Sequence, residues 1–171
     1  MTKIKIFIEL TRLNKPIGFM LLFWPCAWGL TLALNQTKEF GLFVKYIILF
    51  FVGSVLMRSA GCIFNDIVDK DFDKKVDRTK NRPIASGKIS TQESFMYIIL
   101  LCFIALIILI QFNFLTIVLG LLSMPFAFSY PFMKRITYWP QFFLGLTFNW
   151  GILMAWAAVI GKISIEPILL Y

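Results

Sequence analysis

Five long apolar runs constrain this chain more than any other feature of its sequence. Each run approaches the length of about 20 residues that a helix needs to cross the hydrocarbon core of a bilayer. A soluble helical bundle would show a polar face on each helix, but a run such as YIILLCFIALIILI has none. The sequence therefore predicts an all-α integral membrane bundle, one transmembrane domain over residues 1–171, with spans at 16–34, 46–64, 95–111, 114–130 and 142–160.

The composition excludes several other classes of protein. A net charge of +8 would make nucleic acid the first partner to consider for a soluble protein. Here 59% of the residues are hydrophobic, and the basic residues lie between the apolar runs, so the lipid membrane explains the charge and no nucleic-acid partner is expected. Cys26, Cys62 and Cys102 fall inside apolar stretches and the chain has no histidine, which argues against a zinc or haem site.

The positions of lysine and arginine predict the orientation of the bundle. Short cytoplasmic loops carry an excess of these residues. Thirteen basic residues lie in the N-terminal segment, in the loop 65–94 and in the link after the fourth run, whereas the opposite side carries three. We therefore expect the N-terminus and the loop 65–94 to face the cytoplasm.

The loop 65–94 opens with NDIVDKDFDKKVDRTKNRPIASG, which contains five aspartates and six basic residues. If the second span continues as a helix, Asp66, Asp69 and Asp73 share one face, Asp77 extends that face and Asp71 points away. Clustered carboxylates repel one another unless a cation lies among them, and magnesium suits such a site because it leaves coordination positions to water and phosphate oxygens. The alternative is a solvated helix with exposed ion pairs, which contribute little to stability.

Basic side chains beside these carboxylates predict that the bound group is a diphosphate. Arg78, Lys80 and Arg82 can donate hydrogen bonds to phosphate oxygens while a metal bridges the acids to the same group. Arg58 differs because it lies within a span, where an ionisable residue normally faces a cavity. It can also snorkel to the interface, and both interpretations stay open.

Two motifs in the loop resemble the UbiA superfamily of intramembrane prenyltransferases. NDIVDKDFD matches the signature NDxxDxxxD, and residues 78–87 match RTxxRPxxSG. Within the superfamily, the segments RLNKPIGFMLLFWPCAW, MRSAGCIFND and YPFMKRITYWPQ are most similar to the 4-hydroxybenzoate polyprenyltransferases of ubiquinone biosynthesis. The resemblance covers the chain from Arg12 to about Gly161.

The resemblance implies an activity, a cofactor and a place in the cell. Members of this family transfer a polyprenyl group from polyprenyl diphosphate to 4-hydroxybenzoate with Mg²⁺, in the bacterial or the mitochondrial inner membrane. The implied catalytic and metal-binding residues are Asp66, Asp69 and Asp73. The implied substrate-binding residues are Asn65, Arg78, Lys80 and Arg82 for the diphosphate, with Arg12, Asn14 and Arg58 as candidates for the acceptor carboxylate. Tyr130, Lys134 and Arg135 are candidates to close over the diphosphate, and the alternative that they anchor the membrane interface stays open.

The resemblance also sets an expectation about completeness. The family fold has nine helices and two Asp-rich loops that face each other, and the sequence contains the first loop alone. We therefore expect the 171 residues to be catalytically incomplete without a complementing C-terminal chain, as a truncated or split-gene fragment would be. A UbiA relative with a naphthoate, tocopherol-type or haem acceptor would share the first signature. A transporter would also carry charge within the membrane, so both of these functions stay open.

Overall fold

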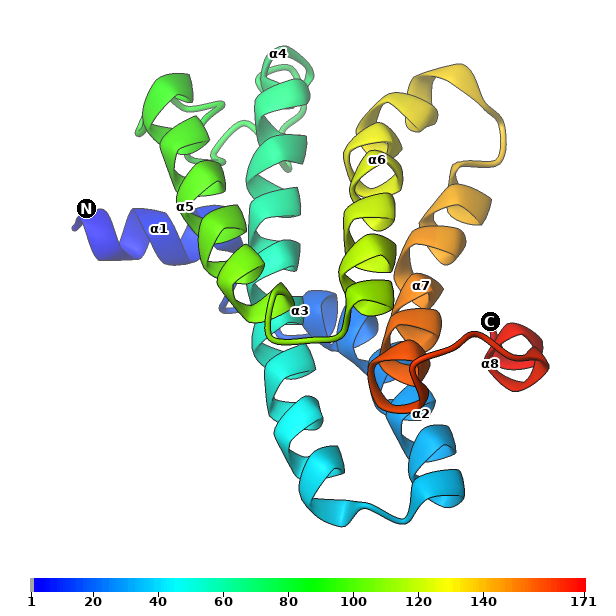
Figure 1. The fold of residues 1–171 in the computed structure, drawn as a ribbon. Helices are drawn as coiled ribbons and strands as arrows, with labels where there is room; N and C mark the ends of the chain where they lie inside the picture. Colours follow the sequence, from blue (N-terminus) through cyan, green and yellow to red (C-terminus); the bar gives the residue numbers. More distant parts are fainter. Residues whose placement is uncertain (1) are drawn as a thin grey trace.

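Helices account for nearly all the regular structure of the chain (Figure 1). The computed structural model describes residues 2–171, except for the side chains of Lys134 and Arg135. In this part of the chain there is no strand. The helices are α1 (Lys3–Thr11), α2 (Ile17–Thr37), α3 (Phe40–Val68), α4 (Lys70–Asp73), α5 (Thr91–Leu109), α6 (Phe114–Ile136), α7 (Pro140–Ile160) and α8 (Ile165–Leu170).

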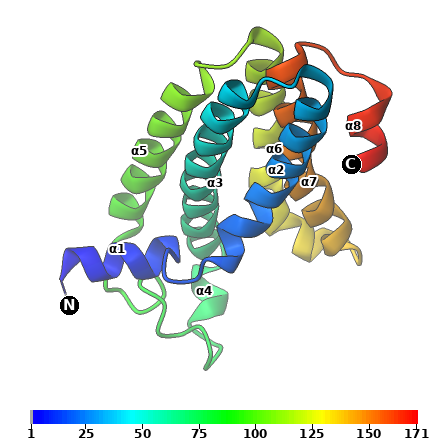
Figure 2. The same ribbon diagram turned by 90° about the horizontal axis from the view of Figure 1, so that it is seen from below.

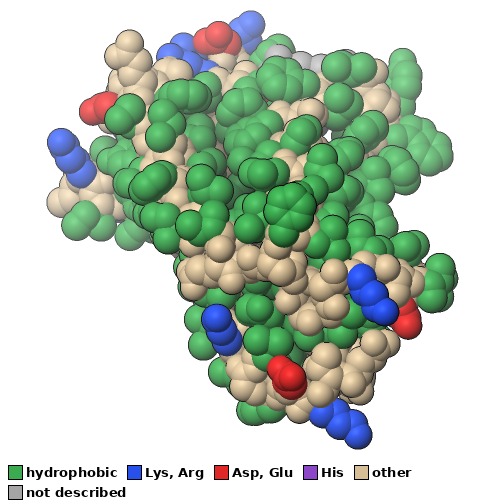
Figure 3. Space-filling model, viewed as in Figure 1, with side chains coloured by type: hydrophobic (Ala, Val, Ile, Leu, Met, Phe, Trp, Pro, Cys, Tyr) green, Lys and Arg blue, Asp and Glu red, His purple; other side chains and the backbone are tan. Residues whose placement is uncertain are grey.

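The predicted all-α membrane bundle is confirmed. Among the described residues, α2, α3, α5, α6 and α7 are long and apolar enough to cross a bilayer. Each matches one predicted span, and several extend past the apolar run because backbone hydrogen bonding continues into the polar residues that follow or precede it. A band of hydrophobic side chains crosses the face seen in Figure 3, with charged side chains near its two ends.

Local signals in the sequence set several helix ends. Ser90 and Glu93 form a reciprocal capping box that begins α5. The side chain of Asn113 caps α6 by accepting a hydrogen bond of 2.9 Å from the backbone N–H of Thr116. Gly161, at φ 76°, ends α7 in the left-handed conformation that glycine adopts without strain.

The five spans pack in the spatial order α5, α3, α2, α7, α6, with lighter contacts from α6 back to α3 and α5. Small residues allow α2 and α7 to approach closely: a Cβ added at Gly29 would lie 2.6 Å from the carbonyl oxygen of Ile152. A Cβ added at Gly151 would collide with the Sγ atom of Cys26. Close approach through small residues is the usual way that helices associate in lipid, where burial of apolar surface gives little driving force.

Helix α1 lies across the ends of the spans rather than along them (Figure 2). Its residue Leu10 is fully buried in a cluster with Ala60 and Ile63 of α3. The ring of Phe7 packs edge-on against Tyr97 of α5, with 5.2 Å between ring centroids. This contact fixes the chain just before Arg12, whose left-handed backbone (φ 57°) ends the helix.

Candidate functional site

The five spans enclose a cavity of about 580 Å³. Charged and polar side chains line it beside the end of α3, whereas aliphatic and aromatic side chains of α5, α6 and α7 line the remainder. Phe50 and Asn65, both in the lining, are about 22 Å apart along α3 at 1.5 Å per residue. The cavity is therefore elongated, with a charged end and a long apolar part.

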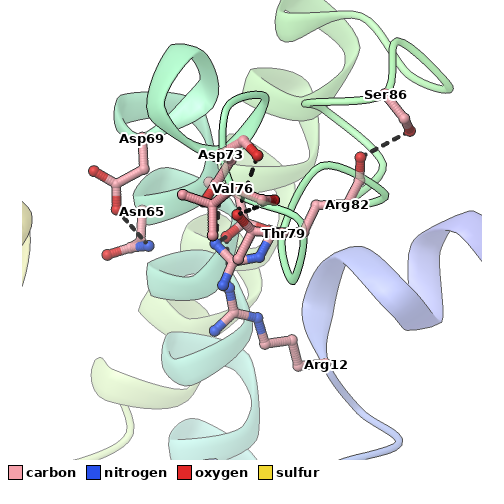
Figure 4. Close-up of polar contacts among 9 residues, drawn as sticks. Arg12, Asn65, Asp69, Asp73, Val76, Thr79, Arg82 and Ser86 are labelled. Atoms are coloured by element: carbon pink, nitrogen blue, oxygen red, sulfur yellow. Dashed lines mark hydrogen bonds and ion pairs between the residues drawn. The ribbon is translucent and has the colours of Figure 1, made fainter.

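The charged end is built where α3 passes into α4. Helix α3 continues to Val68, and Asp69 follows with φ −90° and ψ 3° before α4 begins. Asn65, Asp69 and Asp73 line the cavity from this junction. The Nδ2 atom of Asn65 donates a hydrogen bond of 3.1 Å to Oδ2 of Asp69, and Figure 4 shows this pair lying apart from the arginines.

Asp66 occupies a different environment from Asp69. Its side chain is 2% exposed and does not line the cavity. Its Oδ1 accepts hydrogen bonds from Nη2 of Arg12 at 2.5 Å and from Nη1 of Arg82 at 3.1 Å. Arg82 also donates to Oδ2 of Asp73 at 2.8 Å (Figure 4). This network joins the segment after α1 and the loop 74–90 to the end of α3.

The loop 74–90 is folded against the bundle. Ile84 is 1% exposed and packs in the same cluster as Leu10 and Ala60. The hydroxyl of the buried Thr79 donates a hydrogen bond of 3.1 Å to the backbone carbonyl oxygen of Asp73. The hydroxyl of Ser86 donates a hydrogen bond of 2.8 Å to the backbone carbonyl oxygen of Arg82 (Figure 4). These contacts hold the motif at residues 78–87 beside the cavity.

The prediction that Asp77 extends the carboxylate face is wrong, because the helix ends at Asp73. The Asp77 side chain is 97% exposed and pairs with Lys80 at 2.8 Å. Asp71, predicted to point away, is 84% exposed and pairs with Lys74 at 3.2 Å. Both pairs belong to the solvated surface of the loop.

Arg58 lies inside the bundle and lines the cavity. Its Cζ atom lies 5.6 Å from the centroid of the Phe148 ring of α7, a cation–π distance. Its Nε atom is buried and has no hydrogen-bond partner among the described residues. No ion pair joins it to any described carboxylate. A cation within a membrane-spanning helix costs free energy when it has no anionic partner, so this position suits an anionic group of a ligand.

The structure brings most of the predicted binding residues together and leaves some outside. Arg12, Arg58, Arg78, Arg82 and Tyr130 line the cavity along with Asn65, Asp69 and Asp73. Lys80 and Asn14 are exposed and do not line it. The side chains of Lys134 and Arg135 lie outside the described residues. Sequence reasoning missed Thr79 and Phe148; Thr79 belongs to the matched motif at residues 78–87, whereas nothing in the sequence singles out Phe148.

The carboxylates at the charged end of the cavity fit a magnesium ion that is coordinated by phosphate oxygens as well as by the protein. No group of three or more His, Cys, Asp or Glu side chains among the described residues is close enough to hold a metal by itself. Magnesium commonly takes only one or two protein carboxylates and fills its other positions with water and phosphate oxygens. Asp69 and Asp73, with the amide oxygen of Asn65, offer oxygen donors of this kind beside the cavity.

These features define a helical membrane bundle whose cavity has a charged end and a long apolar part. The UbiA prenyltransferase family model matches residues 22–171, so the chain belongs to this family. Its fold is similar to that of a UbiA homolog from Aeropyrum pernix K1, with a TM-score of 0.71 over 88% of this chain and 54% of that one, at 24% identity.

Curated relatives show a closer likeness in sequence. The chain is 48% identical to the mitochondrial 4-hydroxybenzoate polyprenyltransferase of Rattus norvegicus over 91% of its length and 41% of that protein. It is 45% identical to the Caenorhabditis elegans protein of the same name, over 94% of this chain and 45% of the relative. It is also 46% identical to a 4-hydroxybenzoate octaprenyltransferase of Vibrio atlanticus, over 92% of this chain and 54% of that protein. The chain thus spans about half the length of these relatives or less.

Proposed function

We propose that this chain supplies the first diphosphate-binding half of an enzyme that transfers a polyprenyl group to 4-hydroxybenzoate in ubiquinone biosynthesis. The observation that supports it best is the cavity, whose carboxylates and arginines stand at one end of a long apolar lining. A polyprenyl diphosphate has the same division into a charged head and an apolar tail. The names of the curated relatives support 4-hydroxybenzoate as the acceptor.

The head group binds at the end of α3 in this proposal. Mg²⁺ held by Asn65, Asp69 and Asp73 would act as a Lewis acid that neutralises charge on the leaving diphosphate. Arg78 is exposed at this end and makes no ion pair with any residue the structure describes, so its guanidinium is available for phosphate oxygens. Arg82 forms ion pairs with Asp66 and Asp73 through Nη1. In this proposal its remaining N–H groups donate hydrogen bonds to phosphate oxygens.

The apolar lining protects the reaction from water. When the C–O bond to the diphosphate breaks, the tail becomes an allylic cation that water would consume. Exclusion of water by the cavity wall leaves the acceptor as the available nucleophile. The ring carbon ortho to the hydroxyl of 4-hydroxybenzoate forms the new C–C bond, and the ring then loses its proton from that carbon.

The acceptor carboxylate binds Arg58 in this proposal. Arg58 lies two helical turns from Asn65, which separates its anion site from the diphosphate site by about 10 Å. Its cation has no carboxylate partner in the described part of the chain. Arg12, the other arginine predicted for the acceptor, is instead paired with Asp66.

The cellular setting follows from the relatives and from the charge bias. Curated relatives include mitochondrial and bacterial proteins, so we propose an inner-membrane location. The excess of basic residues in the N-terminal segment and the loop 65–94 favours the cytoplasmic side, or its mitochondrial equivalent, for the charged end of the cavity.

The test measures the transferred product. The chain is expressed in a bacterial strain that lacks its own 4-hydroxybenzoate prenyltransferase, alone and together with the C-terminal part of the Vibrio relative. Mass spectrometry of lipid extracts should detect prenylated 4-hydroxybenzoate in at least one case, and Asp69→Asn should abolish it. Membrane insertion of both pieces with no product would refute the proposed function.

A further inference from the structure

Gly18, in the first turn of α2, lies against the guanidinium of Arg58. A Cβ atom added at Gly18 would lie 2.9 Å from Nε, 3.5 Å from Nη2 and 3.7 Å from Cζ of Arg58. All three atoms belong to one side chain, and they are the nearest atoms to that position apart from the neighbouring residues of the chain and the backbone of α2 itself. At this point α2 and α3 therefore meet through the backbone of Gly18 and the guanidinium of Arg58.

Two other helices approach the Arg58 guanidinium. The backbone of α2 at Gly18 lies against it, and the centroid of the Phe148 ring of α7 lies 5.6 Å from Cζ. Arg58 lines the cavity, whereas Gly18 does not. The missing side chain at residue 18 leaves the room that the guanidinium occupies, a close approach that glycine alone permits.

We infer that Gly18 is a positioning residue that sets the affinity of the chain for the carboxylate of the aromatic acceptor, by fixing where the Arg58 guanidinium lies. This inference rests on the proposed function, because it takes Arg58 as the acceptor-binding cation. A methyl group at residue 18 displaces the guanidinium, because it would lie 2.9 Å from Nε. The displaced cation no longer donates two N–H groups to the carboxylate in the geometry that a guanidinium requires.

The fold should tolerate this substitution. The colliding atoms are the end of a flexible side chain rather than backbone, so Arg58 moves and the helices stay in place. Alanine is also a better helix former than glycine. Gly18→Ala should therefore keep the melting temperature of the parent chain while changing the position of one cation.

The matched control is Gly145→Ala. Gly145 is also a glycine inside a spanning helix, α7, and a Cβ added there meets nothing within 4 Å. It does not line the cavity. Any general effect of replacing a helical glycine with alanine appears in both variants, whereas displacement of Arg58 appears in Gly18→Ala alone.

The first measurement observes Arg58 without any substrate. The chain has five arginines, so selective ¹⁵N-arginine labelling gives few Nε–Hε signals, and loss of a signal in Arg58→Gln assigns that of Arg58. The Phe148 ring shifts this signal because Cζ lies over it. Gly18→Ala should move the signal and Gly145→Ala should not. An unmoved signal in Gly18→Ala would overturn the inference.

The second measurement compares binding of two ligands by calorimetry in nanodiscs. Gly18→Ala should weaken 4-hydroxybenzoate binding about tenfold or more, the effect of losing one charge-assisted hydrogen bond, and should leave binding of a farnesyl diphosphate analogue with Mg²⁺ unchanged. Equal 4-hydroxybenzoate affinity in Gly18→Ala and the parent overturns the role of Gly18 alone. A parent chain that binds 4-hydroxybenzoate no better than Arg58→Gln overturns the acceptor site together with this inference.

Discussion

Replacing Asp66 with asparagine should destabilise the bundle more than any other single change in the Asp-rich segment. The carboxylate is 2% exposed and accepts from Arg12 and Arg82, whose side chains are each 28% exposed. Removing one partner of a fully buried ion pair costs about 3–5 kcal/mol, whereas an exposed pair contributes about 1 kcal/mol or less. Because both arginines reach solvent and Arg82 keeps Asp73, we expect the loss to be about 2 kcal/mol.

Asparagine is the appropriate substitution because it keeps the shape of the side chain, whereas it removes the charge and replaces one acceptor oxygen with an amide donor. The free energy of unfolding is measured by denaturant titration of the chain in bicelles, with helix content as the signal. Asp71→Asn is the control: its carboxylate is 84% exposed, and its loss should cost less than about 0.5 kcal/mol. If Asp66→Asn and Asp71→Asn prove equally stable, the Asp66 network does not hold the site together.

Comparison of Asp66→Asn with Asp69→Asn separates a supporting carboxylate from a metal-binding one. The Mg²⁺ concentration that gives half-maximal binding of a fluorescent prenyl diphosphate analogue should rise about tenfold or more in Asp69→Asn, since a carboxylate ligand to the metal is lost. It should stay near the parent value in Asp66→Asn, because Asp66 does not line the cavity. An equal rise of the half-maximal Mg²⁺ concentration in both variants would show that Asp66 contributes to metal binding as much as Asp69 does.

Three further predictions concern the fold and its orientation. Gly151→Ala should destabilise the α2–α7 pair by about 1–3 kcal/mol through overpacking against Cys26, with Gly145→Ala as the neutral control in the same denaturant titration. Ser90→Ala should remove the capping box of α5 at a cost of about 1 kcal/mol, and an unchanged unfolding midpoint would contradict this role. Lys80→Cys places a thiol at an exposed position, and this thiol should react with a membrane-impermeant reagent in inside-out vesicles. Labelling in intact cells would show that the loop 65–94 faces the opposite side of the membrane.

The five spans could be predicted from the sequence because hydropathy reports directly on the solvent around a helix. Helix α1 was not predicted, since it is short and lies across the ends of the spans. Its signal was present in the spacing of Ile4, Phe7 and Ile8 at i, i+3 and i+4, which is typical of an amphipathic helix. Its role became clear only from the packing of Leu10 and the position of Arg12.

The candidate site could be predicted in kind but not in detail. The motif identified Asn65, Asp69 and Asp73 as neighbours, and the structure places all three in the cavity lining. The motif and the helical periodicity both grouped Asp66 with them, because sequence spacing does not show which arginines lie opposite each carboxylate. Arg12 is 54 positions from its partner Asp66, so no local pattern could reveal this pair. Gly18 was equally hidden, since its role depends on a side chain of another helix.

Photolabelling tests the central claim most directly, that the charged end of the cavity binds the diphosphate while the apolar lining holds the prenyl tail. A prenyl diphosphate analogue with a diazirine at the end of its tail should label peptides from the apolar lining, such as those that contain Leu109 or Met154. Labelling should require Mg²⁺, fall in Asp69→Asn and stay unchanged in Asp71→Asn. Labelling that is independent of both Mg²⁺ and Asp69, or that is confined to the outer, lipid-facing surface, would contradict the claim.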